Sequence, residues 1–145
     1  MRDIEKTIGN LIDKANMTII SYIENGFPIS KAMLVPRERE GLHTFWFSTN
    51  TSSNKVKAFM KNPNASIYFV DRRFFKGVNL EGTMEVLDTP EAKERLWEIG
   101  DRLYYRKGVT DPDYIVLRFT AQEGRYYSNL KSEDFSVNGT EIKQI

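Results

Sequence analysis

The sequence predicts an α+β protein: a small antiparallel barrel, closed or split, of six or seven strands with about three flanking helices. Three observations predict this class. Short strand-like segments follow one another with turn signals between them, helical periodicity occurs in only three places, and the strand–helix alternation of a parallel sheet is missing. The 145 residues contain no repeat and no low-complexity linker, so we expect one domain over residues 1–145.

The first third of the chain predicts a helix and then a meander of strands. Apolar side chains recur at helical spacing from Ile4 to Ala15, with charged side chains mostly on the other faces. The pair Asn25-Gly26 favours a tight hairpin turn between two strands, and a charged turn precedes a third, aromatic strand. We expect these strands at residues 17–23, 28–35 and 43–49.

The middle of the chain predicts a second helix, which ends at Asn62 because the residue before a proline is pushed out of the helical region. Two strands follow, at residues 65–71 and 77–88. Gly82 lies in the middle of the second one, which indicates a bulge or a close backbone approach.

The last third predicts a helix that begins at Thr89-Pro90-Glu91, where a capping hydroxyl, a proline and an acid coincide. We expect this helix to end near Gly108 and to turn four apolar side chains inward, Ala92, Leu96, Ile99 and Leu103. A final hairpin is expected from residues 111–120 and 124–129. Residues 131–145 are polar, and we expect a partly loose tail.

Composition narrows the function. A net charge of +1 gives no reason to expect a nucleic-acid partner, and no apolar run approaches the roughly 20 residues of a membrane helix. With no cysteine and one histidine, the chain lacks the usual ligands of zinc and the parts of a nucleophile–histidine–acid site. We expect a cytoplasmic protein, and His43, at the start of a strand, to be a surface residue.

The segment FSTNTSSNKVKAFMKNP, residues 47–63, joins an apolar strand to a helix and is rich in hydroxyl and amide side chains. Ser52, Ser53 and Asn54 fall where they could cap the helix. They also fall where the helix offers unpaired amides to an anion such as phosphate. Lys55 has the wrong charge for a helix start, which favours the anion, and Lys31 lies in an otherwise apolar strand.

The order FPISKAMLVP, FWFSTNTSSNKVKAFMKNPNASIYFVD, GVNLEGTMEVLD and DPDYIVLRFTAQEGRYYSN resembles the FMN-binding split-barrel proteins related to pyridoxamine 5'-phosphate oxidase. It is most similar to their short branch, the general stress protein family. The similarity spans about residues 8–129, and its most specific part is the pattern from Ser53 to Pro63.

The resemblance implies a homodimer with FMN at the subunit interface. It implies that Ser53, Lys55 and Lys31 hold the FMN phosphate, with Asn54 as a weaker anchor where the oxidase has arginine. Further cofactor contacts are implied along the ribityl chain and around the flavin, from Ser48, Thr49, Asn50 and Tyr127.

The sequence also departs from the oxidase. Gly77 stands where the oxidase uses glutamine, and the substrate-binding arginine–histidine region of the oxidase is missing. We therefore expect a flavin-dependent oxidoreductase acting on an unknown small molecule, rather than a pyridoxamine phosphate oxidase. The alternatives are a non-catalytic flavin-binding or stress-sensing module, or the same barrel with FAD, a deazaflavin or haem as its ligand.

Overall fold

The computed structural model describes residues 3–73 and 75–145. In these residues nine strands form one antiparallel sheet, with three α-helices and two short 3₁₀ helices around it. The strands are β1 (Thr18–Glu24), β2 (Phe27–Met33), β3 (Glu38–Glu40), β4 (Thr44–Asn50), β5 (Asn64–Asp71), β6 (Lys76–Leu87), β7 (Tyr114–Ser128), β8 (Lys131–Asn138) and β9 (Glu141–Gln144). The helices are α1 (Ile4–Lys14), α2 (Asn54–Lys61), α3 (Pro90–Leu96), η1 (Ile99–Leu103) and η2 (Gly108–Thr110).

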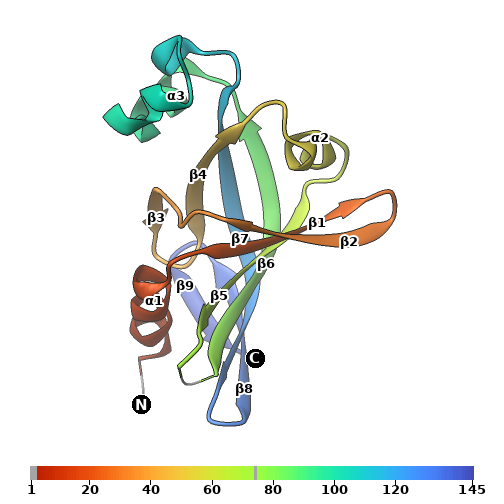
Figure 1. Cartoon of the computed structure of the whole chain (residues 1–145). Coiled ribbons are helices and arrows are strands. Elements are labelled where there is room, and N and C mark those ends of the chain that lie inside the picture. The colour runs from red at the N-terminus through yellow and green to blue at the C-terminus, as the bar shows by residue number, and fades with distance from the viewer. Residues whose placement is uncertain (1–2, 74) are drawn as a thin grey trace.

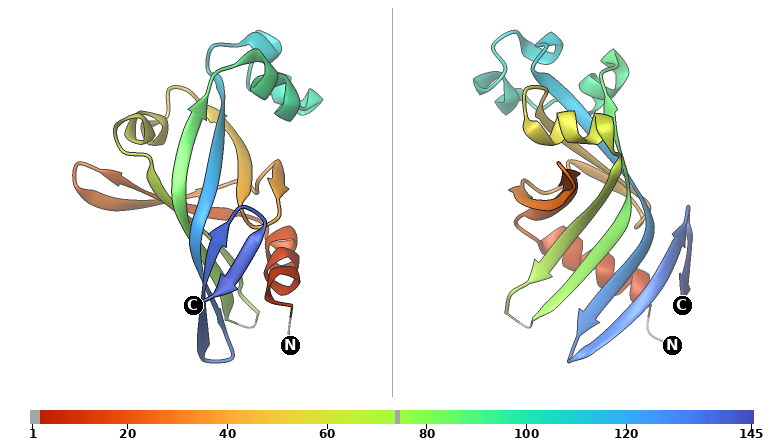
Figure 2. Two further views of the ribbon diagram at one scale, coloured as in Figure 1. Left: turned by 180° about the vertical axis from the view of Figure 1, so that it is seen from behind. Right: turned by 90° about the vertical axis from the view of Figure 1, so that its right-hand side faces the viewer.

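The sheet is a split barrel because its longest strand changes partners along its length. The strand order is β2-β1-β5-β6-β7-β4-β3. The first half of β7 pairs with β4 on the side away from β6, and its second half pairs with β8 instead. Helix α3 lies at one end of the molecule, and α1 lies at the other end with both termini (Figures 1 and 2). The predicted fold class, an α+β split barrel, is confirmed.

Two apolar cores hold the strands together. The larger one fills the barrel and is covered by α1 and α2, with Phe45, Phe69 and Phe119 fully buried at its centre. The smaller one lies under α3 and contains Trp46, Leu96, Tyr105, Tyr114 and Val116. This second core ties the segment between β6 and β7 to the end of β4, next to the cleft described below.

The predicted last hairpin is wrong, because residues 114–128 form the single strand β7. Gly124, which we expected to begin the second strand of that hairpin, lies within β7 and packs closely: a Cβ atom on it would lie 2.3 Å from the Phe135 ring. The tail that we expected to be partly loose forms β8 and β9, and it buries Phe135 and Val137. The strand count is therefore nine rather than six or seven.

The predicted third helix is shorter than expected. It ends at Leu96, because Trp97 adopts an extended backbone and packs its ring edge-on against Tyr114 at 5.1 Å. Ile99 and Leu103, which we expected to point inward, are 93% and 85% exposed.

Two local predictions are confirmed. Asn25 and Gly26 both have positive φ, 51° and 80°, as a two-residue hairpin turn of this kind requires. In β6 the pairing register shifts between Glu81 and Gly82, so Gly82 lies at a bulge. A Cβ atom on Gly82 would lie 1.9 Å from the backbone oxygen of Thr120, so the close backbone approach is also present.

Replacing Gly82 tests that approach. Gly82→Ala should lower the free energy of unfolding by about 1–3 kcal/mol, because the methyl group meets backbone that cannot move aside. Urea denaturation measures the change. Gly100→Ala is the matched control: its Cβ would meet nothing within 4 Å, and we expect a change within about 0.5 kcal/mol. Equal effects of the two changes would contradict this explanation.

Candidate functional site

A cleft of about 460 Å³ opens along the free edge of β4. One wall is the chain that follows β2, and the other is formed by the end of β4, the start of α2 and the segment before β7. Four of the predicted site residues line it: Ser48, Thr49, Asn50 and Lys55.

The edge of β4 is open because β3 is short. β3 pairs only with residues 44–46, and Arg37 donates its backbone N–H to the Trp46 oxygen at 2.9 Å. Beyond Trp46, no strand within residues 3–73 and 75–145 pairs with this side of β4. Alternate residues of a strand direct their N–H and C=O groups to the same side, so those of Ser48 point into the cleft, as those of Trp46 point toward β3.

Ser53 is the N-cap residue directly before α2, but its side chain forms no capping hydrogen bond to the helix. Its backbone N–H donates to the Asn50 oxygen at 3.1 Å, and its hydroxyl is buried without a hydrogen-bond partner in the described part of the chain. The interpretation of Ser53 as a side-chain cap is therefore wrong. A buried hydroxyl without a partner is costly, and it lies next to first-turn amides that accept an anion readily.

Lys55, in the first turn of α2, is only 6% exposed. No carboxylate of the described residues lies within salt-bridge distance of its ammonium group, and no hydrogen bond to that group is formed there. Burial, and secondly the positive charge of Lys31, lower the pKa of Lys55. A buried cation without a counter-ion is unfavourable, so this site favours a bound anion.

Lys31 lies on β2, opposite Ile20 of β1, and is exposed. It does not line the cleft, yet its charge acts on Lys55. Asn54, the first residue of α2, is exposed and does not line the cleft either. Of the residues predicted to hold a phosphate, Lys55 lines the cleft, Ser53 directly precedes α2 without lining it, and Lys31 lies near enough for its charge to act on Lys55.

Tyr127 is not brought to this cleft within one chain. Asn50 pairs with Tyr114 at one end of β7, whereas Tyr127 pairs with Gly77 thirteen residues further along, roughly 40 Å for an extended strand. The Tyr68 side chain covers Gly77, with its hydroxyl 2.1 Å from where a Cβ atom would be. His43 lies at the other end of β4 from the cleft, where its Nδ1 is 2.7 Å from the Thr44 hydroxyl.

Four residues that the sequence analysis missed also line the cleft: Arg37, Asp101, Tyr105 and Asp113. Arg37 donates two hydrogen bonds to the Asp101 carboxylate, at 2.7 and 2.9 Å, and this bonding lowers the pKa of Asp101. Burial raises the pKa of Tyr105, so its hydroxyl stays protonated at neutral pH. Residues up to 64 positions apart meet here, and no local sequence pattern could have identified them.

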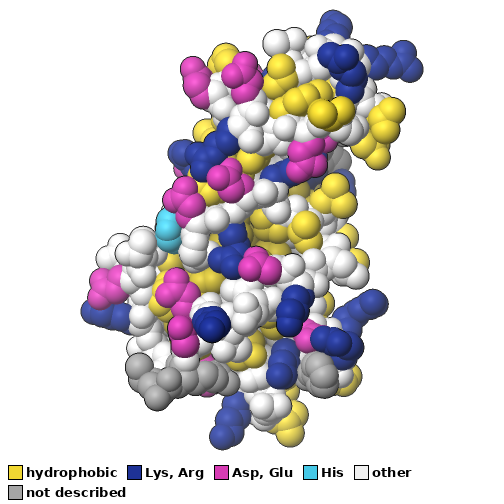
Figure 3. All heavy atoms as spheres, turned by 90° about the vertical axis from the view of Figure 1, so that its left-hand side faces the viewer, with side chains coloured by type: hydrophobic (Ala, Val, Ile, Leu, Met, Phe, Trp, Pro, Cys, Tyr) yellow, Lys and Arg dark blue, Asp and Glu magenta, His cyan; other side chains and the backbone are white. Residues whose placement is uncertain are grey.

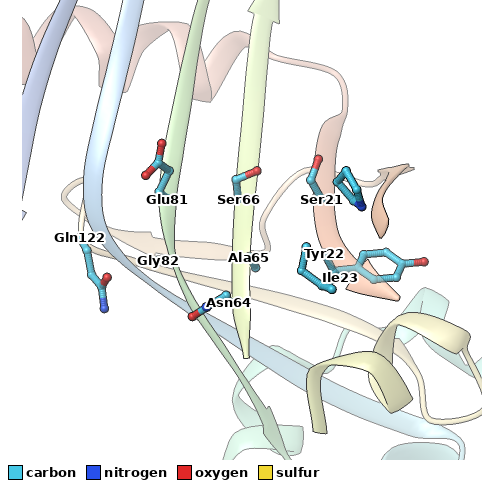
Figure 4. Close-up of a pocket in the computed structure, with 10 residues that line it drawn as sticks. Ser21, Tyr22, Ile23, Asn64, Ala65, Ser66, Glu81, Gly82 and Gln122 are labelled. Carbon is cyan, nitrogen blue, oxygen red and sulfur yellow. The ribbon is translucent and has the colours of Figure 1, made fainter. Parts of the chain in front are cut away.

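A second cleft, of about 420 Å³, lies on the sheet where β1, β5 and β6 meet. Ser21, Ser66 and Glu81 line it from these neighbouring strands, and Gln122 of β7 lies at its border (Figure 4). None of the predicted site residues is among its lining residues. The β4 cleft is therefore the candidate site.

Fold and cleft define the class of protein. It is a split barrel in which the side chains of Lys55 and Ser53, at the start of α2, have no polar partner among residues 3–73 and 75–145. The chain belongs to the family described as pyridoxamine 5'-phosphate oxidase like, whose model matches residues 3–143. A comparison with curated proteins gives no match.

Solved structures agree with this assignment. A Clostridium acetobutylicum protein related to general stress protein 26 of Bacillus subtilis is 39% identical, with a TM-score of 0.84 over 94% of this chain and 99% of that one. General stress protein 26 of Bacillus anthracis is 17% identical, with a TM-score of 0.74 over 90% and 98%. A pyridoxamine 5'-phosphate oxidase-related, FMN-binding protein of Nostoc punctiforme is 12% identical, with a TM-score of 0.74 over 100% and 98%. At these lower identities the likeness shows the fold.

None of the helices in the described residues has the length and apolar character that crossing a membrane would require.

The unpaired charge of Lys55 gives a prediction about stability. Lys55→Met should raise the free energy of unfolding in phosphate-free buffer by about 0.5–2 kcal/mol, because it removes a buried cation. Burial disfavours the charged form, so the gain is present while Lys55 is charged and shrinks as pH rises through its lowered pKa. Chemical denaturation between pH 7 and pH 10 measures it.

The same variant should lose the stabilisation that inorganic phosphate gives to the wild-type protein, seen as a rise in Tm. Lys57→Met, an exposed lysine on the same helix, is the control and should change neither quantity. If Lys55→Met lowered stability and kept the response to phosphate, the anion site would be placed wrongly.

Proposed function

We propose that this protein binds FMN in the β4 cleft and acts as a flavin-dependent oxidoreductase on a small molecule. Two observations at the start of α2 carry the proposal. The Ser53 hydroxyl is buried and has no hydrogen-bond partner among the described residues, and the mostly buried Lys55 has no carboxylate partner there and lines the cleft. A phosphate monoester fits both: its oxygens accept from the hydroxyl, the ammonium and the first amides of α2. Lys31 adds a second positive charge nearby.

The rest of the cleft suits the remainder of FMN. Ser48, Thr49 and Asn50 line it beyond the phosphate site, where they would contact the ribityl chain and the flavin edge. The backbone N–H and C=O of Ser48, on the open edge of β4, can pair with the donors and acceptors of a planar heterocycle.

Bound FMN would supply hydride or electron transfer between a donor and the substrate. The residues of this chain would anchor the phosphate, orient the ring along β4 and keep water from it. We assign no general acid or base. The substrate-binding arginine–histidine region of the oxidase is missing, so the proposed substrate is not pyridoxamine phosphate.

The relatives support this function. The family is named for a pyridoxamine 5'-phosphate oxidase, and the Nostoc relative is described as FMN-binding. The relatives described as general stress protein 26 support a stress-related role. The cytoplasmic location stays a prediction from the sequence.

We also propose a homodimer with the cofactor between its subunits. Apolar side chains next to the cleft are largely exposed: Leu34, Leu103 and Tyr104 are 77%, 85% and 81% exposed. Hydrophobic side chains reach the surface in this upper half of the molecule (Figure 3). A second copy would cover them, and it would supply the Tyr127 that one chain keeps away from its own cleft.

Titration with FMN tests the function. We expect wild-type protein to bind FMN, and Ser53→Ala to weaken binding about tenfold by removing one charge-assisted hydrogen bond. Ser52→Ala is the control, because the Ser52 side chain is exposed and only its backbone N–H is bonded. Adding NADH or NADPH without oxygen should then bleach the flavin absorbance.

Stable colour after this addition would favour a non-catalytic flavin-binding module. Failure to take up FMN would rule out both forms of the proposal.

Mixed dimers test the shared site. Lys55→Met and Tyr127→Ala should each weaken FMN binding. A heterodimer of the two variants should regain one intact site, because the wild-type Lys55 and Tyr127 then meet across the interface. FMN titration of co-purified heterodimers measures this. No recovery would mean that Tyr127 does not complete the partner's cleft.

A further inference from the structure

The loop between β4 and α2, residues 51–53, is held from outside by the chain segment that precedes β7. We propose that residues 97–113, which we name the brace, hold this loop and the end of β4 in the ligand-binding arrangement. Tyr105 and Asp113 are its positioning residues. The identity of the ligand rests on the function proposed above, but the contacts of the brace do not.

Asp113 fixes the loop at its phosphate end. The Asp113 carboxylate accepts the backbone N–H of Ser52 at 3.0 Å, and its backbone oxygen accepts that of Thr51 at 2.7 Å. The Thr51 hydroxyl donates to the oxygen of Pro112 at 2.8 Å. These bonds hold the two residues directly before Ser53, whose hydroxyl is buried without a hydrogen-bond partner among the described residues.

Tyr105 fixes the other end, where β4 finishes. Its hydroxyl donates to the Thr49 backbone oxygen at 3.1 Å and is also hydrogen-bonded to the Asn50 side-chain oxygen. Asn50 is exposed to the cleft, so this contact restrains the orientation of its amide. Tyr105 therefore acts where the ribityl chain and flavin would lie, and Asp113 acts where the phosphate would lie.

The brace can position the loop because it is itself anchored. The rings of Trp97, Tyr105 and Tyr114 contact one another, with centroids 5.1 to 6.3 Å apart. The Tyr114 hydroxyl donates to the Lys93 oxygen at 2.8 Å. Asp101 binds Arg37, which belongs to the opposite wall of the cleft, so the brace contacts both walls.

Without the brace, this loop would have to become ordered when the ligand binds. Within the loop itself, the Ser53–Asn50 backbone bond is the one internal contact in the described structure. Ordering several residues on binding reduces affinity, whereas a loop that is already held does not incur this loss. The bonds of Asp113 are thus expected to raise affinity by holding the loop in place before the ligand binds.

The effects of the two positioning residues can be distinguished by using ligands that occupy different parts of the cleft. Calorimetry would measure the affinity of each variant for inorganic phosphate, for riboflavin and for FMN. Asp113→Ala should lower the affinity for phosphate and for FMN by about five- to tenfold and leave the affinity for riboflavin unchanged. Tyr105→Phe should lower the affinity for riboflavin and for FMN by about five- to tenfold and leave the affinity for phosphate unchanged.

Two further variants separate positioning from general stability. Asp113→Asn keeps an oxygen acceptor for the Ser52 N–H, and it should restore the affinity that Asp113→Ala loses. Tyr114→Phe removes a buried hydroxyl of the same aromatic cluster that bonds Lys93 rather than β4. It should lower Tm and leave all three affinities unchanged.

If Asp113→Ala and Tyr105→Phe both kept wild-type affinity for every ligand, the proposed role of the brace would be wrong. The proposed function would be unaffected. The role of the brace would also be wrong if the variants lost affinity equally for all three ligands and their Tm fell in parallel. If wild-type protein bound phosphate but neither flavin, the function would fail, and the Asp113 pair would still test the brace. If it bound none of the three, both proposals would fail.

Discussion

The burial of Lys55, with no carboxylate of the described residues paired with it, is the constraint on which the candidate site depends. Burial without a counter-ion works against folding, so the surrounding structure must supply stability elsewhere. The packed barrel core around Phe45 and Phe119 does so. The unpartnered hydroxyl of Ser53 adds to the same imbalance. A bound phosphate, as proposed, would give both groups partners, and the protein would then exchange stability for affinity.

Strand lengths place this constraint at a ligand-sized opening. Because β3 spans only Glu38–Glu40, β4 keeps a free edge just where it leads into α2. Because β7 is fifteen residues long, it pairs with β4 in one half and with β8 in the other. The bulge at Gly82 lets β6 follow β7 through this change of partner. The cleft is therefore a consequence of the split in the barrel.

Short sequence patterns predicted those structural features that depend on interactions between neighbouring residues. The charge of Lys55 at a helix start, the Asn25-Gly26 turn and the bulge at Gly82 each carry their signal within a few residues. The features that the sequence analysis missed depend on contacts between distant segments. The ring of Phe135 packs against Gly124 within β7, where we expected a hairpin, and Tyr105 meets Asn50 across 55 positions. The sequence thus predicted the cleft residues of β4 and α2, and it missed those that the segments after β2 and before β7 contribute.

The distance between the two ends of β7 bears on how the site is completed. The family resemblance implies that Lys55 and Tyr127 contact one cofactor, yet β7 places Tyr127 roughly 40 Å along the strand from Tyr114, which pairs with the cleft end of β4 in the same chain. At Gly77, where the oxidase has glutamine, the Tyr68 side chain occupies the space beside the backbone. This end of the sheet therefore offers a different surface from that of the oxidase. If a second copy brings it to the cleft, Tyr68 and Tyr127 together would set how this protein differs from its relatives in the ligand it accepts.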